Sequence, residues 1–261
     1  MNIARQLAKY ESKGFTTQRA QVNVMMEAAA FAVFRDFPDA FVLFGGATLV
    51  LYHDSVRHSA DLDLLSRGTQ VPSREQIMAC LEADLPPLAE AMEAGPIEIE
   101  ADESQNREQR IYITRAGGER LFRVDLSNLG SAIEGEIESH PVNGAGISVV
   151  VKSATKELLL LQKAEAFLLR RKVKVRDAYD IHLLKALGAE LNLNLQGHLA
   201  DTVLANGIDE DTILERIEHI NVNRCQSELK PILPADVYSK LEEADFEPLR
   251  SGLEELYQQW L

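Results

Sequence analysis

Two aspartates separated by one residue, Asp61 and Asp63, are the side chains of this sequence that most directly suggest chemistry. They lie in the stretch Asp-Leu-Asp-Leu-Leu, where polar and apolar residues alternate as in a strand with one buried face. Both carboxylates therefore point to one face, while Leu62 and Leu64 point to the other. Two carboxylates about 7 Å apart repel each other unless a cation lies between them. The pair predicts a site for a divalent metal ion.

A glycine pair, Gly45-Gly46, comes between an apolar run at 41–44 and a helix-forming run at 47–54. The pattern predicts a strand, a glycine turn, a short helix and then the strand that carries Asp61 and Asp63. Backbone N–H groups at the start of a helix bind phosphate, and they are accessible where glycine replaces a side chain. A phosphate site beside a metal-ready pair of carboxylates indicates an enzyme that uses a nucleoside triphosphate.

A third carboxylate, Asp125, is expected on a later strand. Segments 97–101, 110–114 and 119–126 are rich in strand-forming residues, and the turn Arg-Ala-Gly-Gly joins the last two as a hairpin. Along the third segment Arg123 and Asp125 share one face. We expect Asp125 either to help to bind the metal or to be a secondary carboxylate that the reaction does not need.

The remaining elements are predicted from helical periodicity and from helix-breaking residues. Residues 1–36 form two helices, of which the second covers 17–34. Another helix begins near residue 73 and is interrupted at Pro86-Pro87. A loop at 127–146 leads to a last strand at 147–151. Helix-forming residues dominate after residue 153, where Ser153 or Thr155 is a candidate helix cap.

The predicted fold class is α+β, with a mixed sheet flanked by helices and a helical C-terminal region. We place the domain boundary near residue 150, which gives a core domain at 1–150 and a helical domain at 151–261. Hydrophobic residues make up 46% of the 261 residues and charged residues 26%, as in ordinary soluble proteins. The sequence contains neither a secretory leader nor an apolar run that could span a membrane, so a cytoplasmic protein is expected.

The charge distribution is uneven. The formal net charge is -14, which argues against general binding to nucleic acid. Between residues 152 and 176, however, there are eight basic residues and two acidic ones, so this segment is a candidate phosphate-binding patch. From residue 208 onward, thirteen acidic residues face five basic ones. We interpret that excess as a solvated helical surface, with a protein-binding surface as the alternative.

The glycine pair and the three aspartates together resemble the nucleotidyltransferase superfamily. Its signature is an apolar residue before Gly-Gly or Gly-Ser, then Asp-x-Asp or Asp-x-Glu, then a later acidic residue on a strand. The resemblance is closer to the AbiEii/AbiGii-type toxin nucleotidyltransferases, which read Gly-Gly-x-x-Leu followed by Arg-x-Ser-x-Asp-x-Asp. This sequence has Gly45-Gly46-Ala47-Thr48-Leu49 and then Arg57-His58-Ser59-Ala60-Asp61-Leu62-Asp63.

The resemblance continues on the predicted helices and covers residues 40–185. The toxins carry a helical lysine, then arginines and an Arg-Asp segment, which correspond here to Lys163, Arg170 and Arg176-Asp177-Ala178-Tyr179-Asp180. The implied cofactor is Mg²⁺ or Mn²⁺, and the implied substrate is a nucleoside triphosphate. The implied catalytic residues are Asp61, Asp63, Lys163, Asp180 and Asp177; the nucleotide-binding residues are Gly45, Gly46, Arg57, Ser59 and Lys163; the metal ligands are Asp61, Asp63 and Asp125.

Several of these residues also have a purely structural interpretation. Lys163 lies on an apolar helical face, so it either reaches an anion or pairs with a structural carboxylate. Arg57 and Ser59 either contact phosphate or support the acidic strand. The sequence does not decide which of Asp177 and Asp180 faces the site. His53 and His58 have no neighbours at metal-ligand spacing, so neither is taken as a ligand.

The implied reaction is transfer of a nucleoside monophosphate to an acceptor hydroxyl, with tRNA or another RNA as one candidate acceptor. The implied role is that of the toxin of an AbiE-like toxin–antitoxin or phage-defence system, with a cognate antitoxin as a possible partner. Two alternatives remain open: a nucleotidyltransferase that modifies a small molecule such as an antibiotic, and a non-catalytic nucleotide-binding regulator. A haloacid-dehalogenase phosphatase fits less well, because it needs Asp-x-Asp-x-Thr or Asp-x-Asp-x-Val directly after its first strand, whereas here the fifth residue is Leu65 and a Gly-Gly strand comes before the motif. An Asp-x-Asp glycosyltransferase fits less well, because nothing else in the sequence resembles that fold.

Overall fold

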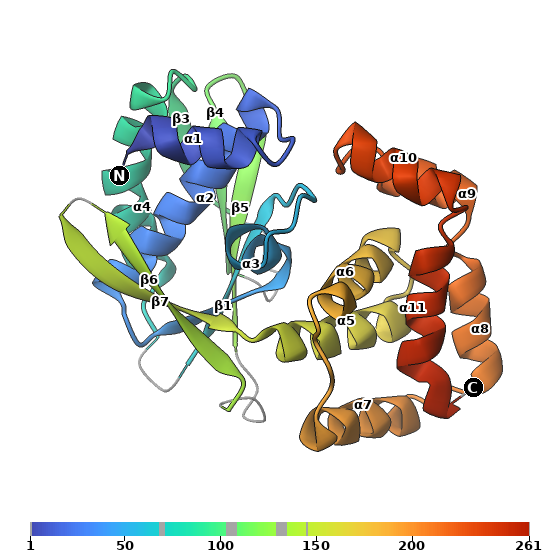
Figure 1. The fold of residues 1–261 in the computed structure, drawn as a ribbon. Helices are drawn as coiled ribbons and strands as arrows, with labels where there is room; N and C mark the ends of the chain where they lie inside the picture. Colours follow the sequence, from blue (N-terminus) through green and yellow to red (C-terminus); the bar gives the residue numbers. More distant parts are fainter. Residues whose placement is uncertain (1, 68–70, 103–108, 129–134, 145, 261) are drawn as a thin grey trace. The chain divides into compact units, whose positions relative to one another are not determined.

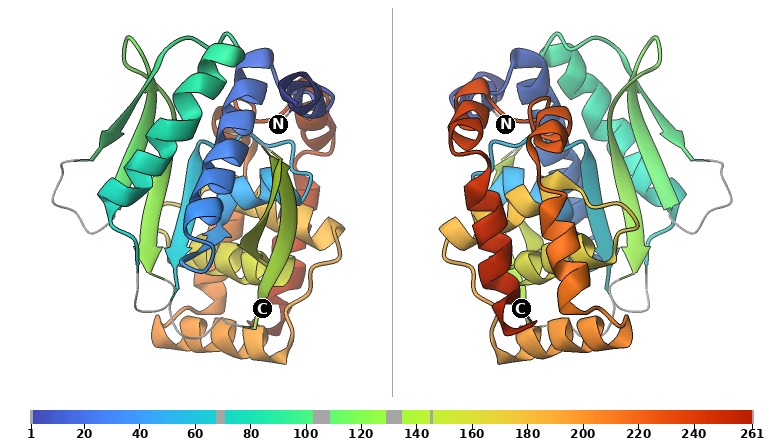
Figure 2. Two further views of the ribbon diagram at one scale, coloured as in Figure 1. Left: turned by 90° about the vertical axis from the view of Figure 1, so that its left-hand side faces the viewer. Right: turned by 90° about the vertical axis from the view of Figure 1, so that its right-hand side faces the viewer.

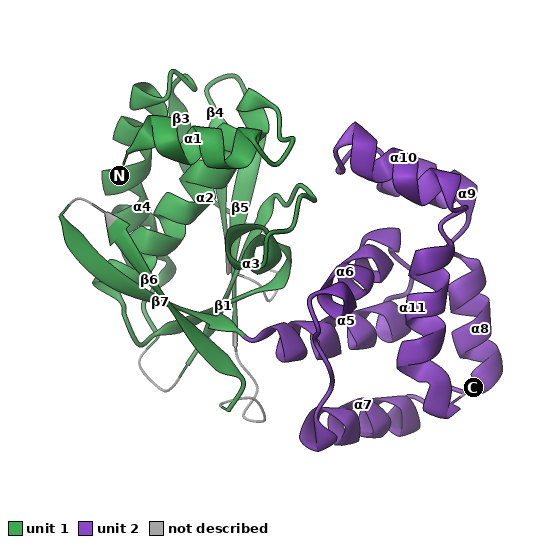
Figure 3. Ribbon diagram, viewed as in Figure 1, with its two compact units in different colours: residues 1–154 green, residues 155–261 purple. Residues whose placement is uncertain are grey.

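A computed structural model describes residues 2–67, 71–102, 109–128, 135–144 and 146–260. The chain forms two compact units, residues 1–154 and 155–261 (Figure 3). Each unit is described by itself below. The first contains a sheet with helices and the second contains helices alone (Figure 1).

Unit 1 is built on a seven-stranded sheet with the order β3-β4-β5-β2-β1-β7-β6. Two neighbouring pairs, β2 with β5 and β1 with β7, are parallel, and the other pairs are antiparallel. The predicted mixed sheet is thereby confirmed. The strands are β1 (Phe41–Phe44), β2 (Asp61–Ser66), β3 (Ile97–Ala101), β4 (Gln109–Arg115), β5 (Glu119–Asn128), β6 (Ile137–Gly144) and β7 (Ile147–Ala154).

The helices of unit 1 are α1 (Ile3–Glu11), α2 (Thr17–Asp36), α3 (Gly45–Tyr52) and α4 (Arg74–Ala91). Helices α2 and α4 lie side by side against one face of the sheet (Figure 2). Helix α2 is apolar around most of its circumference and buries much of its length, which agrees with its place between the sheet and other helices. Thr16 caps α2, because its hydroxyl accepts a hydrogen bond from the N–H of Arg19.

Strand β2, which carries Asp61 and Asp63, lies at the centre of the sheet. All four residues of β1 are buried, whereas along β2 half-buried residues alternate with buried ones. Leu62 and Leu64 are completely buried, so Asp61 and Asp63 share the opposite face, as the alternation predicts. The parallel register of β2 and β5 sets Asp63 beside Asp125.

Two expectations about unit 1 are wrong. Helix α4 is not interrupted at Pro86-Pro87, since both prolines lie inside the helix. The carbonyls that lose their N–H partners belong to Glu82 and Ala83, which are exposed and accessible to water. The predicted loop at 127–146 contains β6 and the end of β5, while its residues 129–134 and 145 lie outside the described part. Strand β6 is at the sheet edge, where Pro141 is tolerated.

Unit 2 is helical, as the sequence predicts. Its elements are α5 (Lys156–Leu169), α6 (Val175–Ala186), α7 (Leu193–Ala205), α8 (Glu210–Glu218), α9 (Val222–Glu228), α10 (Ala235–Glu243), α11 (Glu247–Tyr257) and the 3₁₀ turn η2 (Gln258–Trp260). Thr155 caps α5 through the N–H of Leu158, which selects it over Ser153 as the cap.

Helix α5 is the core element of unit 2, where it contacts α6, α7 and α8. The hydroxyl of Tyr257, at the end of α11, donates to the carbonyl of Ala164 at 2.8 Å, and its ring stacks on Phe167. Among the described residues no helix combines the length and the apolar character needed to cross a bilayer.

Candidate active site

The turn between β1 and α3 is closely packed around its two glycines. Gly45 has φ +72°, and a Cβ atom at this position would lie 1.9 Å from Oδ2 of Asp63. A Cβ atom on Gly46 would lie 2.5 Å from Nη2 of Arg57 and 2.8 Å from Oγ of Ser59. A side chain at either position would displace one of these neighbours, and at Gly45 the positive φ adds backbone strain. Five of the sequence-predicted residues therefore meet at this turn.

The same turn has features that suit an anion. Phe44, the N-cap residue of α3, provides no side-chain cap for the first turn of that helix. The N–H groups of such a turn carry partial positive charge. Arg57 and Ser59 are buried, and Nη1 of Arg57 donates to the carbonyl of His58 at 3.0 Å. Arg57 thus supports the loop that enters β2, and its own guanidinium places a positive charge beside the glycines.

The other two predicted carboxylates are engaged by arginine. Nε of Arg123 lies 2.9 Å from Asp125 and 3.3 Å from Asp61, because the register of β2 and β5 sets Arg123 beside Asp61. Nε of Arg110, on β4, lies 3.3 Å from the second oxygen of Asp125. Burial raises the pKa of Asp125, and the hydrogen bond from Arg123 opposes that shift.

These carboxylates can be compared with what a divalent metal ion needs. Carboxylate oxygens suit Mg²⁺ and Mn²⁺, and Asp61 and Asp63 present two half-buried carboxylates on one strand face. Asp125 is instead held by two arginines, and the described residues contain no group of three His, Cys, Asp or Glu side chains arranged around a metal position. The pair fits a metal ion, and Asp125 joins it only if Arg123 moves away.

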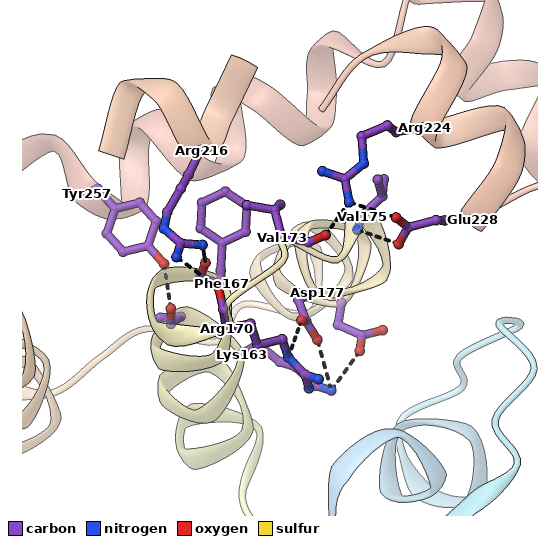
Figure 4. Close-up of polar contacts among 12 residues, drawn as sticks. Lys163, Phe167, Arg170, Val173, Val175, Asp177, Arg216, Arg224, Glu228 and Tyr257 are labelled. Atoms are coloured by element: carbon purple, nitrogen blue, oxygen red, sulfur yellow. Dashed lines mark hydrogen bonds and ion pairs between the residues drawn. The ribbon is translucent and has the colours of Figure 1, made fainter. Parts of the chain in front are cut away.

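In unit 2, Lys163 lies between two buried carboxylates (Figure 4). Its Nζ is 3.0 Å from Asp180 and 3.7 Å from Asp177, and the second oxygen of Asp177 is 2.9 Å from Nε of Arg170. Lys163 and Arg170 come from α5 and its C-terminal end, while the two aspartates come from consecutive turns of α6. The packing of α5 on α6 brings all four together.

This cluster is almost entirely shielded from water. The side chain of Lys163 is 8% exposed, and those of Asp177 and Asp180 are 0% exposed. Burial raises the pKa of Asp177, while Lys163 and Arg170 oppose the shift. The sequence does not decide which of the two aspartates faces the site. In the structure both contact Lys163, and Asp180 is the nearer. Lys163 thus has the carboxylate partners that the structural interpretation predicts.

The two histidines have different surroundings. His58 is largely buried, which lowers its pKa to about 4, and Arg19 and Arg57 act in the same direction. Nε2 of His53 lies 3.2 Å from Glu138 of β6, a partner that the sequence gives no means of predicting.

The sequence interpretation missed the role of two arginines, Arg123 and Arg110. One signal was available, since Arg123 precedes Asp125 by two residues on a predicted strand and must share its face. Its contact with Asp61 depends on the pairing of β2 with β5, which local sequence does not reveal.

A sequence profile of the family described as "Nucleotidyl transferase AbiEii toxin, Type IV TA system" matches residues 29–259. The chain belongs to the AbiEii nucleotidyltransferase toxin family. It is therefore a nucleotidyltransferase, and its family is one of toxins in type IV toxin–antitoxin systems, which implies a cognate antitoxin and a nucleoside triphosphate substrate. The resemblance inferred from the glycine and aspartate motifs is confirmed.

Two crystal structures of Helicobacter pylori proteins are similar to this AbiEii-family chain. One protein, assigned as a nucleotidyltransferase, has a TM-score of 0.57 at 17% identity, covering 94% of this chain and 97% of its own. The other, JHP933, has a TM-score of 0.56 at 15% identity, covering 94% of both chains. At such identities the likeness shows a shared fold. No curated protein matches the chain in sequence.

Proposed function

We propose that this AbiEii-family enzyme transfers a nucleoside monophosphate from a nucleoside triphosphate to a hydroxyl group of RNA, with tRNA as the first candidate acceptor. The acceptor oxygen attacks the α-phosphorus in line, the bond between the α-phosphorus and the bridging oxygen breaks, and pyrophosphate leaves. The observation that carries this proposal is the packing of the Gly45 turn against Asp63, on the strand face that also carries Asp61.

In unit 1, Asp61 and Asp63 would hold a divalent cation, Mg²⁺ or Mn²⁺, with Asp125 as a further ligand when Arg123 moves away. The cation supplies Lewis-acid stabilisation of the charge that develops on the transferred phosphoryl group. The triphosphate would be bound at the start of α3, where the backbone N–H groups at Gly45 and Gly46 can donate to it because the N-cap residue, Phe44, provides no side-chain cap.

The remaining predicted residues of the turn and of unit 2 have roles that depend on charge. Arg57 contributes positive charge beside the glycines, and Ser59 contributes a hydroxyl donor. Lys163 would neutralise the negative charge that develops on the pyrophosphate as it leaves. Asp180 and Asp177 keep the ammonium group of Lys163 in one position, since one carboxylate oxygen of each aspartate contacts it.

The choice of RNA as acceptor is supported by the basic segment 152–176 in a chain with a net charge of -14. The same negative total favours the alternative, a small cationic acceptor such as an antibiotic, because an acidic protein attracts cations. The two alternatives predict transfer to different molecules, so the identity of the labelled product separates them.

The test uses purified protein, Mg²⁺ or Mn²⁺, each α-labelled nucleoside triphosphate and total tRNA. The wild type should label RNA, and the double variant Asp61→Asn, Asp63→Asn should lose about 100-fold or more of that activity. The matched control is Asp39→Asn, Asp54→Asn, which removes the same charge at two side chains that are each 86% exposed. Label on a small molecule would select the alternative acceptor, and no transfer to any acceptor would refute the proposal.

A further inference from the structure

Unit 2 contains a cavity of about 340 Å³, here called the α8 pocket. It is bounded by the connection between α5 and α6, by α8 and by the start of α9. Its lining includes four basic side chains and a single carboxylate, together with an exposed histidine. These residues are Arg171, Lys172, Arg216, Arg224, Glu215 and His219. An excess of positive charge in one cavity is unexpected in a chain whose net charge is -14.

Two of the four cations are fixed in place by backbone carbonyls (Figure 4). Arg216 donates to the carbonyl of Phe167 at 2.8 Å and to that of Arg170 at 2.9 Å. Arg224 donates to the carbonyl of Val173 and to Glu228. Each guanidinium has more N–H donors than these bonds use, and the planar group is held rigid. The pocket therefore presents preorganised donors that match the oxygens of a phosphate.

The other two cations, Arg171 and Lys172, are exposed at the rim. Neither forms a hydrogen bond or ion pair with any residue that the structure describes. Burial lowers the pKa of Arg216, which reflects the cost of holding a charge there. Glu215 and Glu228 offset part of the positive charge of the four cations, and the excess that remains would attract an anion.

We propose that the α8 pocket binds the phosphodiester backbone of a single-stranded or looped RNA segment. A polymer is favoured over a free phosphate because the cations extend from the fixed arginines to the rim, so that successive phosphates can be contacted. The proposal deepens the proposed function, on which it rests for taking the RNA to be the acceptor. It names a contact surface distinct from Lys163 and its two aspartates.

The test measures binding of a fluorescently labelled, mixed-sequence RNA oligonucleotide to the full chain by anisotropy. Nucleoside triphosphate is omitted and EDTA is present, so no transfer takes place. The variant Arg171→Gln, Lys172→Gln should bind the RNA at least about 10-fold more weakly at moderate salt. The slope of log affinity against log salt should become less steep by about 1.4, because each phosphate contact on a single strand contributes about 0.7.

The control variant, Lys230→Gln, Lys240→Gln, removes two exposed positive charges of the same unit outside the pocket. Its affinity should stay within about 2-fold of the wild type. Equal weakening in both variants, or no RNA binding by the wild type at low salt, would overturn the proposal. So would competition by polyglutamate or by inorganic phosphate as strong as that by unlabelled RNA, since the pocket would then recognise anions in general.

Failure of this proposal can be told apart from failure of the proposed function. The Asp61→Asn, Asp63→Asn variant should bind the oligonucleotide as tightly as the wild type does. If the pocket variant loses RNA binding while the wild type transfers no nucleotide to any acceptor, the RNA-binding proposal is supported and the proposed transfer reaction is refuted. If the wild type labels RNA while the pocket variant binds it normally, the pocket assignment is wrong.

Discussion

Each unit of this AbiEii-family enzyme holds one cation between two aspartates, but the two clusters differ in exposure. In unit 1, Arg123 contacts Asp61 and Asp125, with side chains that are 29%, 26% and 13% exposed, respectively. In unit 2, Lys163 contacts Asp177 and Asp180, and none of these side chains is more than 8% exposed. The same combination of charges is therefore near water in one unit and shielded from it in the other.

Exposure determines how easily such a cluster can change partners. Partly exposed ion pairs contribute at most about 1 kcal/mol, because water solvates each charge when the partner leaves. A buried pair that loses one member leaves an uncompensated charge, which costs about 3–5 kcal/mol. The unit 1 cluster is thus suited to exchanging an arginine for a metal ion, while the unit 2 cluster keeps its lysine in a fixed position.

The largest effect is expected for Lys163→Met, which leaves Asp177 and Asp180 buried without their shared cation. We expect a loss of about 3–5 kcal/mol in the free energy of unfolding, measured by urea denaturation, together with loss of nucleotidyl transfer. The control Lys240→Met, at an exposed position of α10, should change stability by less than about 0.5 kcal/mol. A loss below about 1 kcal/mol for Lys163→Met would place this cluster in the same class as that of unit 1.

Gly45→Ala should have the next largest effect, about 2–4 kcal/mol, because the new methyl group meets Asp63 and the backbone has positive φ. Gly118→Ala is a matched control: Gly118 also has positive φ, +91°, but a Cβ atom there would meet nothing within 4 Å. Its cost should be about 1–2 kcal/mol, from the backbone alone. Equal losses in the two variants would show that the turn is not tightly packed against Asp63.

His58→Gln tests the one strongly shifted histidine near the unit 1 cluster. The folded state lowers the pKa of His58 from 6.5 to about 4, so it binds a proton less readily than the unfolded state. The resulting stabilisation is complete above pH 6.5 and is lost as the pH falls toward 4. The wild type should lose about 1–2 kcal/mol more than the variant over this range, as followed by thermal unfolding at several pH values. Parallel curves would mean that His58 is solvated.

The smallest change in stability is expected for Arg123→Gln, at most about 1 kcal/mol. Removing this cation from Asp61 and Asp125 should at the same time tighten Mn²⁺ binding roughly 3- to 10-fold, measured by titration calorimetry. Arg5→Gln removes the same charge from an exposed position of α1 and should alter neither property. Destabilisation by Arg123→Gln as large as that by Lys163→Met would remove the difference between the two clusters.

The central strands were predictable from sequence because the signals there are local. Alternation around Asp61 and the glycine pair after a short apolar run each specify an element without distant contacts. Strand β6 carries weaker signals, since an edge strand is hydrogen-bonded on one side and tolerates Pro141. Helix α4 continues through its two prolines because burial of Leu85 and Ala89 on either side outweighs the local preference.

The residues of the candidate site could be named from the sequence, but the contacts among them could not. Motif spacing identified Gly45, Asp63 and Lys163, since each lies in a stretch with a recognisable pattern. The contact of Arg123 with Asp61 depends on which strands become neighbours, and that is settled by the whole sheet. The sharing of Lys163 by two aspartates likewise depends on how α6 packs on α5, which neither helix specifies alone.

The hydrogen bond from Tyr257 to Ala164 has a consequence for how the enzyme is made. The two residues are 93 positions apart, and Ala164 is the neighbour of Lys163 on α5. At about 5–20 residues per second, a ribosome needs about 5–20 s to reach Tyr257 after it has added Ala164. During that interval the helix that carries Lys163 lacks its final packing partner. The nascent chain would thus complete the packing of unit 2, which carries Lys163, only after most of that unit had left the ribosome.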